Sequence, residues 1–244
     1  MTIRRFHVFG QRCSGTNALT RLIERNFPDL QFCESAGFKH WFVPADRAIA
    51  PDAVVVVIAR EVGEWLHSLH AQPWHARPEL AKLPFSHFIR AEWQSIWDSD
   101  FWGVEEGDAI YGTPIREEQC PDTGRPFANA VTKRTAKLRN WLDLEARSSA
   151  FLRVSHTDLV LRPERIVANL AALIERAPTR SFVPVDSYKG EGRRTFEPKK
   201  YPALAEGDRL FVRQHLDPAV EAAFGLSAMT GGAGATDRSP QHGS

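Results

Sequence analysis

The sequence predicts an α/β fold in which a parallel sheet is covered by helices on both faces. Apolar runs of strand length alternate with helical patterns along the chain, which is typical of a parallel sheet. The apolar run AVVVVIA (53–59) is too short to span a membrane and reads as a strand buried on both faces. A chain of 244 residues, 43% of them hydrophobic, suits one large domain with a substantial core.

Each element is predicted from its own residue pattern. Short apolar runs predict strands, and apolar residues spaced three and four apart predict helices. The predicted strands are 5–9, 53–59 and 151–155. The predicted helices are 16–27, 61–70, 84–97, 130–147 and 163–177. Prolines near the start support the helices at 84–97 and 163–177, and the helix at 130–147 is amphipathic and basic.

Two segments stand outside this alternation. Residues 98–128 are acidic and contain glycine, which predicts a lid-like surface insertion. The Gly- and Ser-rich end predicts a disordered C-terminal tail at 228–244. Residues 1–227 are therefore expected to form a single domain.

Composition narrows the classes of function. A net charge of +1 gives no basis for nucleic-acid binding. The N-terminus lacks the apolar core of a signal peptide, and no run is long enough for a membrane span. Three cysteines without Cys-x-x-Cys spacing fit a reducing compartment, so we expect a cytoplasmic protein. The oligomeric state stays open.

A glycine-rich motif joins the first predicted strand to the first predicted helix. Gly10 and Gly15 enclose four residues, the frame of the P-loop of ATP- and GTP-using proteins. Thr16 and Asn17 then stand where Lys and Ser or Thr are expected, so a triphosphate and its Mg²⁺ would lack their usual ligands. The backbone N–H groups of such a turn still attract a smaller anion. The alternative is a plain turn with Ser14 or Thr16 as the N-cap of the helix.

The stretch RCSGTN (12–17) resembles the 5′-phosphosulfate loop of the PAPS-dependent sulfotransferases, a P-loop-derived family. In that family an Arg after a second buried strand and a Ser eight residues later bind the 3′-phosphate of PAPS. Arg60 follows VVVVIA in this chain, and Ser68 follows eight residues later. A guanidinium suits a phosphate because its planar fork is always charged. Taken singly, Arg60 could be a surface charge and Ser68 a solvent-facing helix residue.

The resemblance implies a P-loop NTPase-like three-layer domain that uses PAPS as donor, releases PAP, and needs no metal. It assigns the 5′-phosphosulfate site to Arg12, Cys13, Ser14, Gly15, Thr16 and Asn17. Two departures bear on this assignment. Cys13 stands where many members have a basic residue, and Ala18 stands where a tryptophan often stacks on the adenine.

The resemblance also implies a reacting centre between the two motifs. In the cytosolic sulfotransferases a Lys and a His lie in this interval, and the His is the general base. Lys39 and His40 occupy it here. A neutral imidazole could take the acceptor's proton, and a lysine could neutralise charge on the leaving phosphate. Because the two residues are adjacent, a strand would point them to opposite faces, so a loop is expected.

A basic segment near the C-terminus, DSYKGEGRRTFEPKKYP (186–202), loosely resembles the family's Arg-Lys-Gly segment that closes over the 3′-phosphate. Lys189, Gly190 and Arg193 are the candidates, and a solvated basic loop is the alternative.

Several other residues are expected to be structural. His67 and His70 lie three apart on the predicted helix at 61–70, with His75 beyond it. Their spacing is not that of a metal site, and exposed residues are expected instead. Trp93 and Trp97 are expected to share one face of the helix at 84–97.

The function expected from this resemblance is transfer of a sulfonyl group from PAPS to a hydroxyl or amine of a small-molecule, lipid or carbohydrate acceptor. One alternative is a small-molecule kinase on the same scaffold. Another is a nucleotide-binding module that has lost its chemistry.

Overall fold

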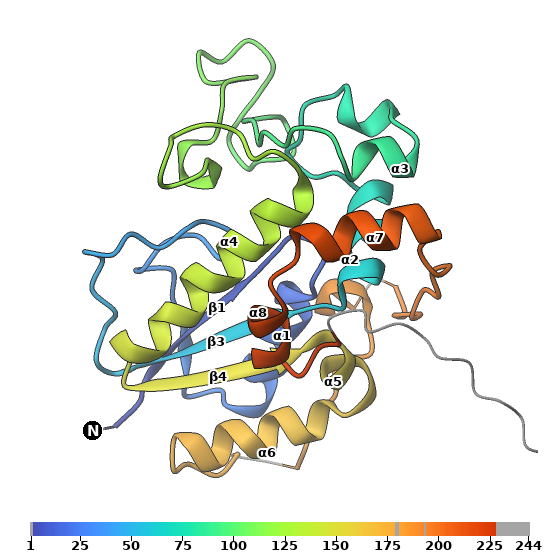
Figure 1. Cartoon of the computed structure of the whole chain (residues 1–244). Coiled ribbons are helices and arrows are strands. Elements are labelled where there is room, and N and C mark those ends of the chain that lie inside the picture. The colour runs from blue at the N-terminus through green and yellow to red at the C-terminus, as the bar shows by residue number, and fades with distance from the viewer. Residues whose placement is uncertain (1, 179–180, 193, 228–244) are drawn as a thin grey trace, which may run out of the picture.

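A four-stranded parallel sheet forms the centre of the computed structural model, which describes residues 2–178, 181–192 and 194–227 (Figure 1). The strands are β1 (Arg5–Gly10), β2 (Gln31–Phe32), β3 (Ala53–Ala59) and β4 (Ala150–Ser155). Their order is β2-β1-β3-β4, and every pairing is parallel. The predicted α/β fold with a parallel sheet is confirmed. The two-residue strand β2 was not predicted.

Alternate side chains of β3 pack against two different layers of helices, one on each face of the sheet. Val54, Val56 and Ile58 pack with α1 (Thr16–Asn26) and α6 (Pro163–Leu173). Val55 and Val57 face the opposite side and pack with α4 (Ala130–Leu142) and α8 (Pro218–Ala223), which lie in front of the sheet in Figure 1. Because successive strand side chains point to opposite faces, this two-sided burial requires a continuous apolar run.

The remaining helices surround the edge of the sheet where its strands end. They are α2 (Val62–Ala71), α3 (Phe85–Phe88), α5 (His156–Leu161) and α7 (Glu206–His215). Short 3-10 turns are η1 (Leu80–Lys82), η2 (Arg116–Glu118), η3 (Asp143–Arg147) and η4 (Tyr188–Gly190). In the described part of the chain, every helix is too short or too polar to cross a membrane.

The predicted helix at 84–97 is wrong beyond Phe88, where α3 ends. Trp93 instead pairs with Phe127 through two backbone hydrogen bonds of 2.8 and 3.0 Å, and Ile96 pairs with Pro114. Trp93 and Trp97 therefore do not share a helical face. Trp93 is buried, while Trp97 contacts the rings of other aromatic residues. In the extended pairing the same apolar residues pack against residues that are distant in the sequence. The spacing of residues along the chain does not reveal such partners.

Two other helices end earlier than predicted. The predicted helix at 130–147 is α-helical only to Leu142 and continues as the 3-10 turn η3. The predicted helix at 163–177 ends at Leu173. Helices α5, α7 and α8 were not predicted. The predicted tail at 228–244 lies outside the described residues.

Residues 181–192 and 194–201, which we call the C-terminal strap, pack against helix α1. Asn26 exchanges two hydrogen bonds of 2.9 Å with the backbone of Val183. Gly190 (φ 74°) lies against Arg21, whose Cγ would be 2.6 Å from a Cβ at this position. A glycine is therefore required where the strap touches the helix. Residues of the strap and of α1 therefore line the same cavity, which lies at the turn between β1 and α1.

Candidate functional site

The turn between β1 and α1 is built from two left-handed residues. Cys13 has φ 65° and Gly15 has φ 92°. The amide and the hydroxyl of Ser14 both donate to the carbonyl of Gln11, at 3.1 and 2.6 Å. Helix α1 begins after Gly15 without a side-chain cap, so the alternative of Ser14 or Thr16 as N-cap is wrong. The first amides of this helix are those that favour an anion.

This turn opens into a cavity of about 420 Å³, which we call the loop cavity. The predicted site residues that line it are Arg12, Cys13, Gly15, Thr16, Asn17, Lys39, His40, Arg60, Ser68 and Lys189. Ser14 is buried behind the turn, and Gly190 packs on Arg21 instead. Arg193 lies outside the described residues. Most of the residues named from the sequence are therefore brought to one place.

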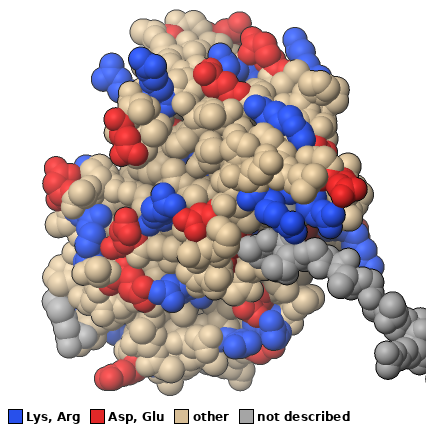
Figure 2. Space-filling model, in the orientation of Figure 1, with Lys and Arg blue, Asp and Glu red and all other residues tan. Residues whose placement is uncertain are grey.

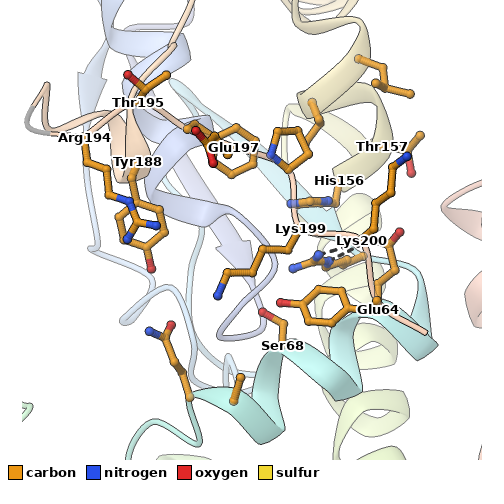
Figure 3. Close-up of a pocket in the computed structure, with 18 residues that line it drawn as sticks. Glu64, Ser68, His156, Thr157, Tyr188, Arg194, Thr195, Glu197, Lys199 and Lys200 are labelled. Carbon is orange, nitrogen blue, oxygen red and sulfur yellow. Dashed lines mark hydrogen bonds and ion pairs between the residues drawn. The ribbon is translucent and has the colours of Figure 1, made fainter. Parts of the chain in front are cut away.

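A second cavity of about 480 Å³, which we call the basic cavity, adjoins the first (Figure 3). The two share walls that include Arg60, Ser68 and His156. The strap adds three cationic side chains to the basic cavity: Arg194, Lys199 and Lys200. In Figure 3, Ser68 and Glu64 rise from α2 on the side opposite Arg194 and Tyr188. Such a set of cations suits an anionic ligand.

Arg60 connects the two predicted motifs directly. It follows β3 and is buried, and its Nη1 donates to the carbonyl of Cys13 at 3.2 Å. Its Nε and Nη2 both reach Oε2 of Glu64 at 3.3 Å. The carboxyl ends of neighbouring parallel strands meet at one edge of a sheet, which explains why the ends of β1 and β3 lie together.

The thiol of Cys13 is neutral in this setting. Burial raises its pKa, and a hydrogen bond with Ser68 and the charge of Arg60 offset this only in part. The sulfur lies 3.7 Å from the carbonyl oxygen of Gln72. A protonated thiol is a poor nucleophile and carries no charge for an anion.

Lys39 and His40 lie in a turn held against the end of β1. The amide of Gly10 donates to the carbonyl of Lys39 at 3.1 Å, and Nδ1 of His40 donates to the carbonyl of Gly10 at 2.6 Å. Nζ of Lys39 donates to Oδ1 of Asn17 at 2.8 Å. Both side chains line the loop cavity although they are adjacent in sequence, because a turn does not impose the alternation of a strand.

The imidazole of His40 is neutral at pH 7. Burial, with the charge of Arg12, holds its pKa well below the usual range. A carbonyl only accepts, so Nδ1 carries the hydrogen and Nε2 presents a lone pair. Among the described residues Nε2 has no hydrogen-bond partner. It is available to a ligand in the loop cavity.

A buried carboxylate beneath the turn is surrounded by three cations. Glu118 forms ion pairs with Arg12, with Lys133 at 2.5 Å and with Lys137 at 3.1 Å, and accepts from Ser95 at 2.8 Å. We call these residues the Glu118 cluster. Burial lowers the pKa of Lys133 to about 8 and that of Lys137 well below its usual range. The lowered pKa values of the lysines reflect burial and the mutual repulsion of cations that one carboxylate offsets only in part.

Arg12 carries this positive charge to the wall of the loop cavity. Its Nε and Nη2 are buried and have no hydrogen-bond partner within the described part of the chain. Sequence reasoning included Arg12 but missed Glu118, Lys133 and Lys137. The spacing of the two lysines on the predicted basic helix was the only signal, and it is common on solvated helices.

His156 is a further wall residue that sequence reasoning missed. It directly follows β4, and it lines both cavities. Burial, with the charge of Arg60, lowers its pKa to about 3. Its place after a predicted strand was the available signal, since ligands bind beyond the carboxyl ends of parallel strands.

His156 is expected to make stability fall with acid. Its pKa is depressed in the folded state, so the unfolded chain takes up the proton first as pH falls through about 6.5, and the loss continues toward pH 3. From pH 7 to pH 5 the unfolding free energy of the wild type should fall by up to about 2 kcal/mol more than that of the His156→Gln variant. Urea unfolding at both values measures this. Equal losses in the two proteins would contradict it.

Comparison of the chain with models of known protein families finds no match, and comparison with curated proteins finds none either. Its function is therefore inferred from the site.

Proposed function

We propose that this protein transfers a sulfonyl group from PAPS to a hydroxyl or amine of an acceptor. The observation that carries the proposal is that Arg60 and Ser68 line the same cavity as the turn at 12–17. The hydrogen bond from Arg60 to the Cys13 carbonyl makes the two anion sites immediate neighbours. PAPS carries anionic groups on both the 5′ and 3′ sides of one ribose, so a single molecule would bridge them.

The residues present fit such a donor. The amides of the turn and Lys39 would hold the phosphosulfate, and Lys39 is already beside Asn17 in that turn. It supplies the charge that the neutral Cys13 lacks. Arg60 and Ser68 would bind the 3′-phosphate, with Lys199 of the basic cavity nearby. A P-loop NTPase-like origin of the domain belongs to the same proposal.

Trp74 is a candidate for the aromatic side chain that Ala18 does not provide. It lines the loop cavity, and Nζ of Lys189 lies 5.3 Å from the centre of its ring. Under this proposal Lys189 acts from the strap, next to the nucleotide. The three cysteines are free, which suits the reducing cytoplasm that the sequence predicts.

The acceptor is proposed to be a small molecule, lipid or carbohydrate rather than a nucleic acid. Figure 2 shows acidic and basic side chains interspersed over the visible face. Nucleic-acid binding normally requires a basic patch or stripe. The cavity at the turn, not this outer face, is where the chemistry is expected.

Nucleotide preference tests the proposal. We expect PAP to raise the thermal unfolding midpoint without Mg²⁺, because a ligand that binds only the native state stabilises it by mass action. ATP with Mg²⁺ should bind more weakly, since the turn lacks the P-loop lysine. Tight Mg²⁺-dependent binding of ATP would instead identify the kinase alternative. PAP binding without release of PAP from PAPS would identify the non-catalytic module, the alternative that the lack of a basic residue at position 13 leaves open.

A further inference from the structure

A second histidine of the loop cavity is held by a carboxylate. Nδ1 of His75 donates to Oδ1 of Asp98 at 2.6 Å, and the same oxygen accepts from the amide of Asp100 at 3.1 Å. The carbonyl of His75 accepts from Ile96 at 2.8 Å. His75 lies beyond the end of α2 at Ala71, and the expectation that it is exposed is wrong, because its side chain is only 10% exposed.

The backbone of His75 is strained. Its φ of 56° lies in the left-handed region, which histidine adopts less readily than glycine. Strain of this kind persists where the surrounding structure imposes it, and it occurs often at functional sites. Here the hydrogen bonds to Ile96 and Asp98 hold the residue in place.

His75 and His40 both line the loop cavity, and a chain of aromatic rings connects them. The ring centre of His75 lies 4.0 Å from that of Phe101, and Phe101 lies 5.9 Å from Phe38. Phe38 in turn meets the ring of His40 edge-on at 5.2 Å. The guanidinium of Arg12 lies 5.9 Å from the Phe101 ring centre. An acceptor with an apolar ring would find both imidazoles and the cation of Arg12 around it.

We propose that His75, positioned by Asp98, accepts the proton from the acceptor during sulfonyl transfer. This rests on the proposed function. The acceptor's oxygen or nitrogen forms a bond to sulfur while its proton passes to Nε2 of His75. The bond between sulfur and the bridging phosphate oxygen breaks, and its electron pair stays on PAP. The imidazolium then returns its proton to solvent.

The two histidines differ in what stabilises their charged forms. The Nδ1–H of His75 meets a carboxylate, which stabilises an imidazolium and fixes its tautomer, as in catalytic triads. The Nδ1–H of His40 meets only a backbone carbonyl. Burial and Arg12 lower the pKa of His75, while Asp98 and Glu118 raise it, and the net effect keeps the ring neutral near pH 7. His75 can therefore both lack a proton at rest and hold one after transfer.

The test compares two phenols of different acidity with PAPS. 2-Naphthol keeps its proton at mildly alkaline pH and needs a base, whereas 4-nitrophenol is largely ionised there and does not. His75→Asn suits the site because Asn tolerates a left-handed φ and its amide can still donate to Asp98. We expect this variant to lower kcat for 2-naphthol by about 100-fold and that for 4-nitrophenol by less than about threefold. Asp98→Asn should lower kcat for 2-naphthol by about tenfold and shift the acidic side of the plot of kcat against pH. The KM for PAPS should stay unchanged.

His215→Asn serves as the matched control, because its Nδ1 bonds a backbone carbonyl on α7 away from both cavities. It should leave both rates unchanged. Equal losses for the two phenols would mean that His75 and Asp98 only hold the fold, and would overturn the proposal. So would unchanged rates, or a larger acidity-dependent loss in His40→Asn than in His75→Asn. A wild type that binds PAP yet releases none from PAPS overturns the catalytic role alone, whereas failure to bind PAP overturns the proposed function as well.

Discussion

Replacing Arg60 with Gln is expected to weaken PAP binding by about 100-fold. Arg60 is buried between the turn and α2, and its guanidinium contacts both, through the Cys13 carbonyl and the Glu64 carboxylate. Charge-assisted hydrogen bonds to a phosphate contribute about 1.5–3 kcal/mol each, which corresponds to roughly tenfold to more than a hundredfold in affinity. A glutamine keeps part of the stem and one donor, so the fold should persist. Isothermal titration calorimetry measures the change.

A comparison ligand shows whether the effect belongs to the 3′-phosphate. AMP has the 5′-phosphate of PAP but lacks the 3′-phosphate, so Arg60→Gln should change its affinity by less than about threefold. Arg139→Gln is a matched control, since Arg139 is exposed on α4 and pairs with Asp217. Equal weakening of PAP and AMP would mean that Arg60 acts through the turn and not on the 3′-phosphate.

Glu118→Gln is expected to lower the free energy of unfolding by about 3–5 kcal/mol. The substitution removes the only carboxylate found in the Glu118 cluster among the described residues, and it leaves Arg12, Lys133 and Lys137 buried together. Breaking a buried ion pair by removing one partner is costly because the remaining charge stays desolvated. Glu117→Gln is the control, because Glu117 precedes it in the same 3-10 turn and is exposed. Urea unfolding of both variants measures the difference.

The pH dependence of this effect has a definite sign. Burial alone would raise the pKa of Glu118, but Arg12, Lys133 and Lys137 together hold it well below the usual range. The folded pKa therefore lies below the unfolded one, and the stabilisation is present above about pH 4.5 and lost as pH falls through the folded pKa. Glu118→Gln should cost at least as much at pH 6 as at pH 7, because Glu118 raises the pKa values of Lys133 and Lys137, and without it these lysines lose their protons more readily as pH rises. A cost below about 1 kcal/mol would show that the cluster contributes little.

The sheet and the proximity of Arg60 to the turn at 12–17 were predictable because each depends on local pattern. The continuous apolar run at 53–59 requires burial on both faces, and β3 has it. Arg60 and the turn at 12–17 each follow a strand, so parallel pairing of β1 and β3 brings them to one edge. The spacing of residues along the chain was therefore enough to predict that Arg60 and Ser68 lie near the turn.

The rest of the site depends on partners that spacing does not reveal. His75 meets Asp98 across 23 residues, and Arg12 meets Glu118 across 106. Neither carboxylate differs locally from the other acidic residues of 98–128. The segment after Phe88 misled for the same reason, because its apolar residues fit a helix as well as the extended pairing with Phe127. Tertiary contacts decided each case.

The packing of the strap against α1 has a consequence for biosynthesis. Asn26 and Val183 are 157 positions apart, and the strap that this contact holds against α1 also supplies cations to the basic cavity. Contacts of such long range form late, since loop-closure entropy must be overcome first. A nascent chain still lacking this last portion could pair β1, β3 and β4, yet under the proposed function it would hold its nucleotide poorly. Ligand capture should therefore begin only when synthesis is nearly complete.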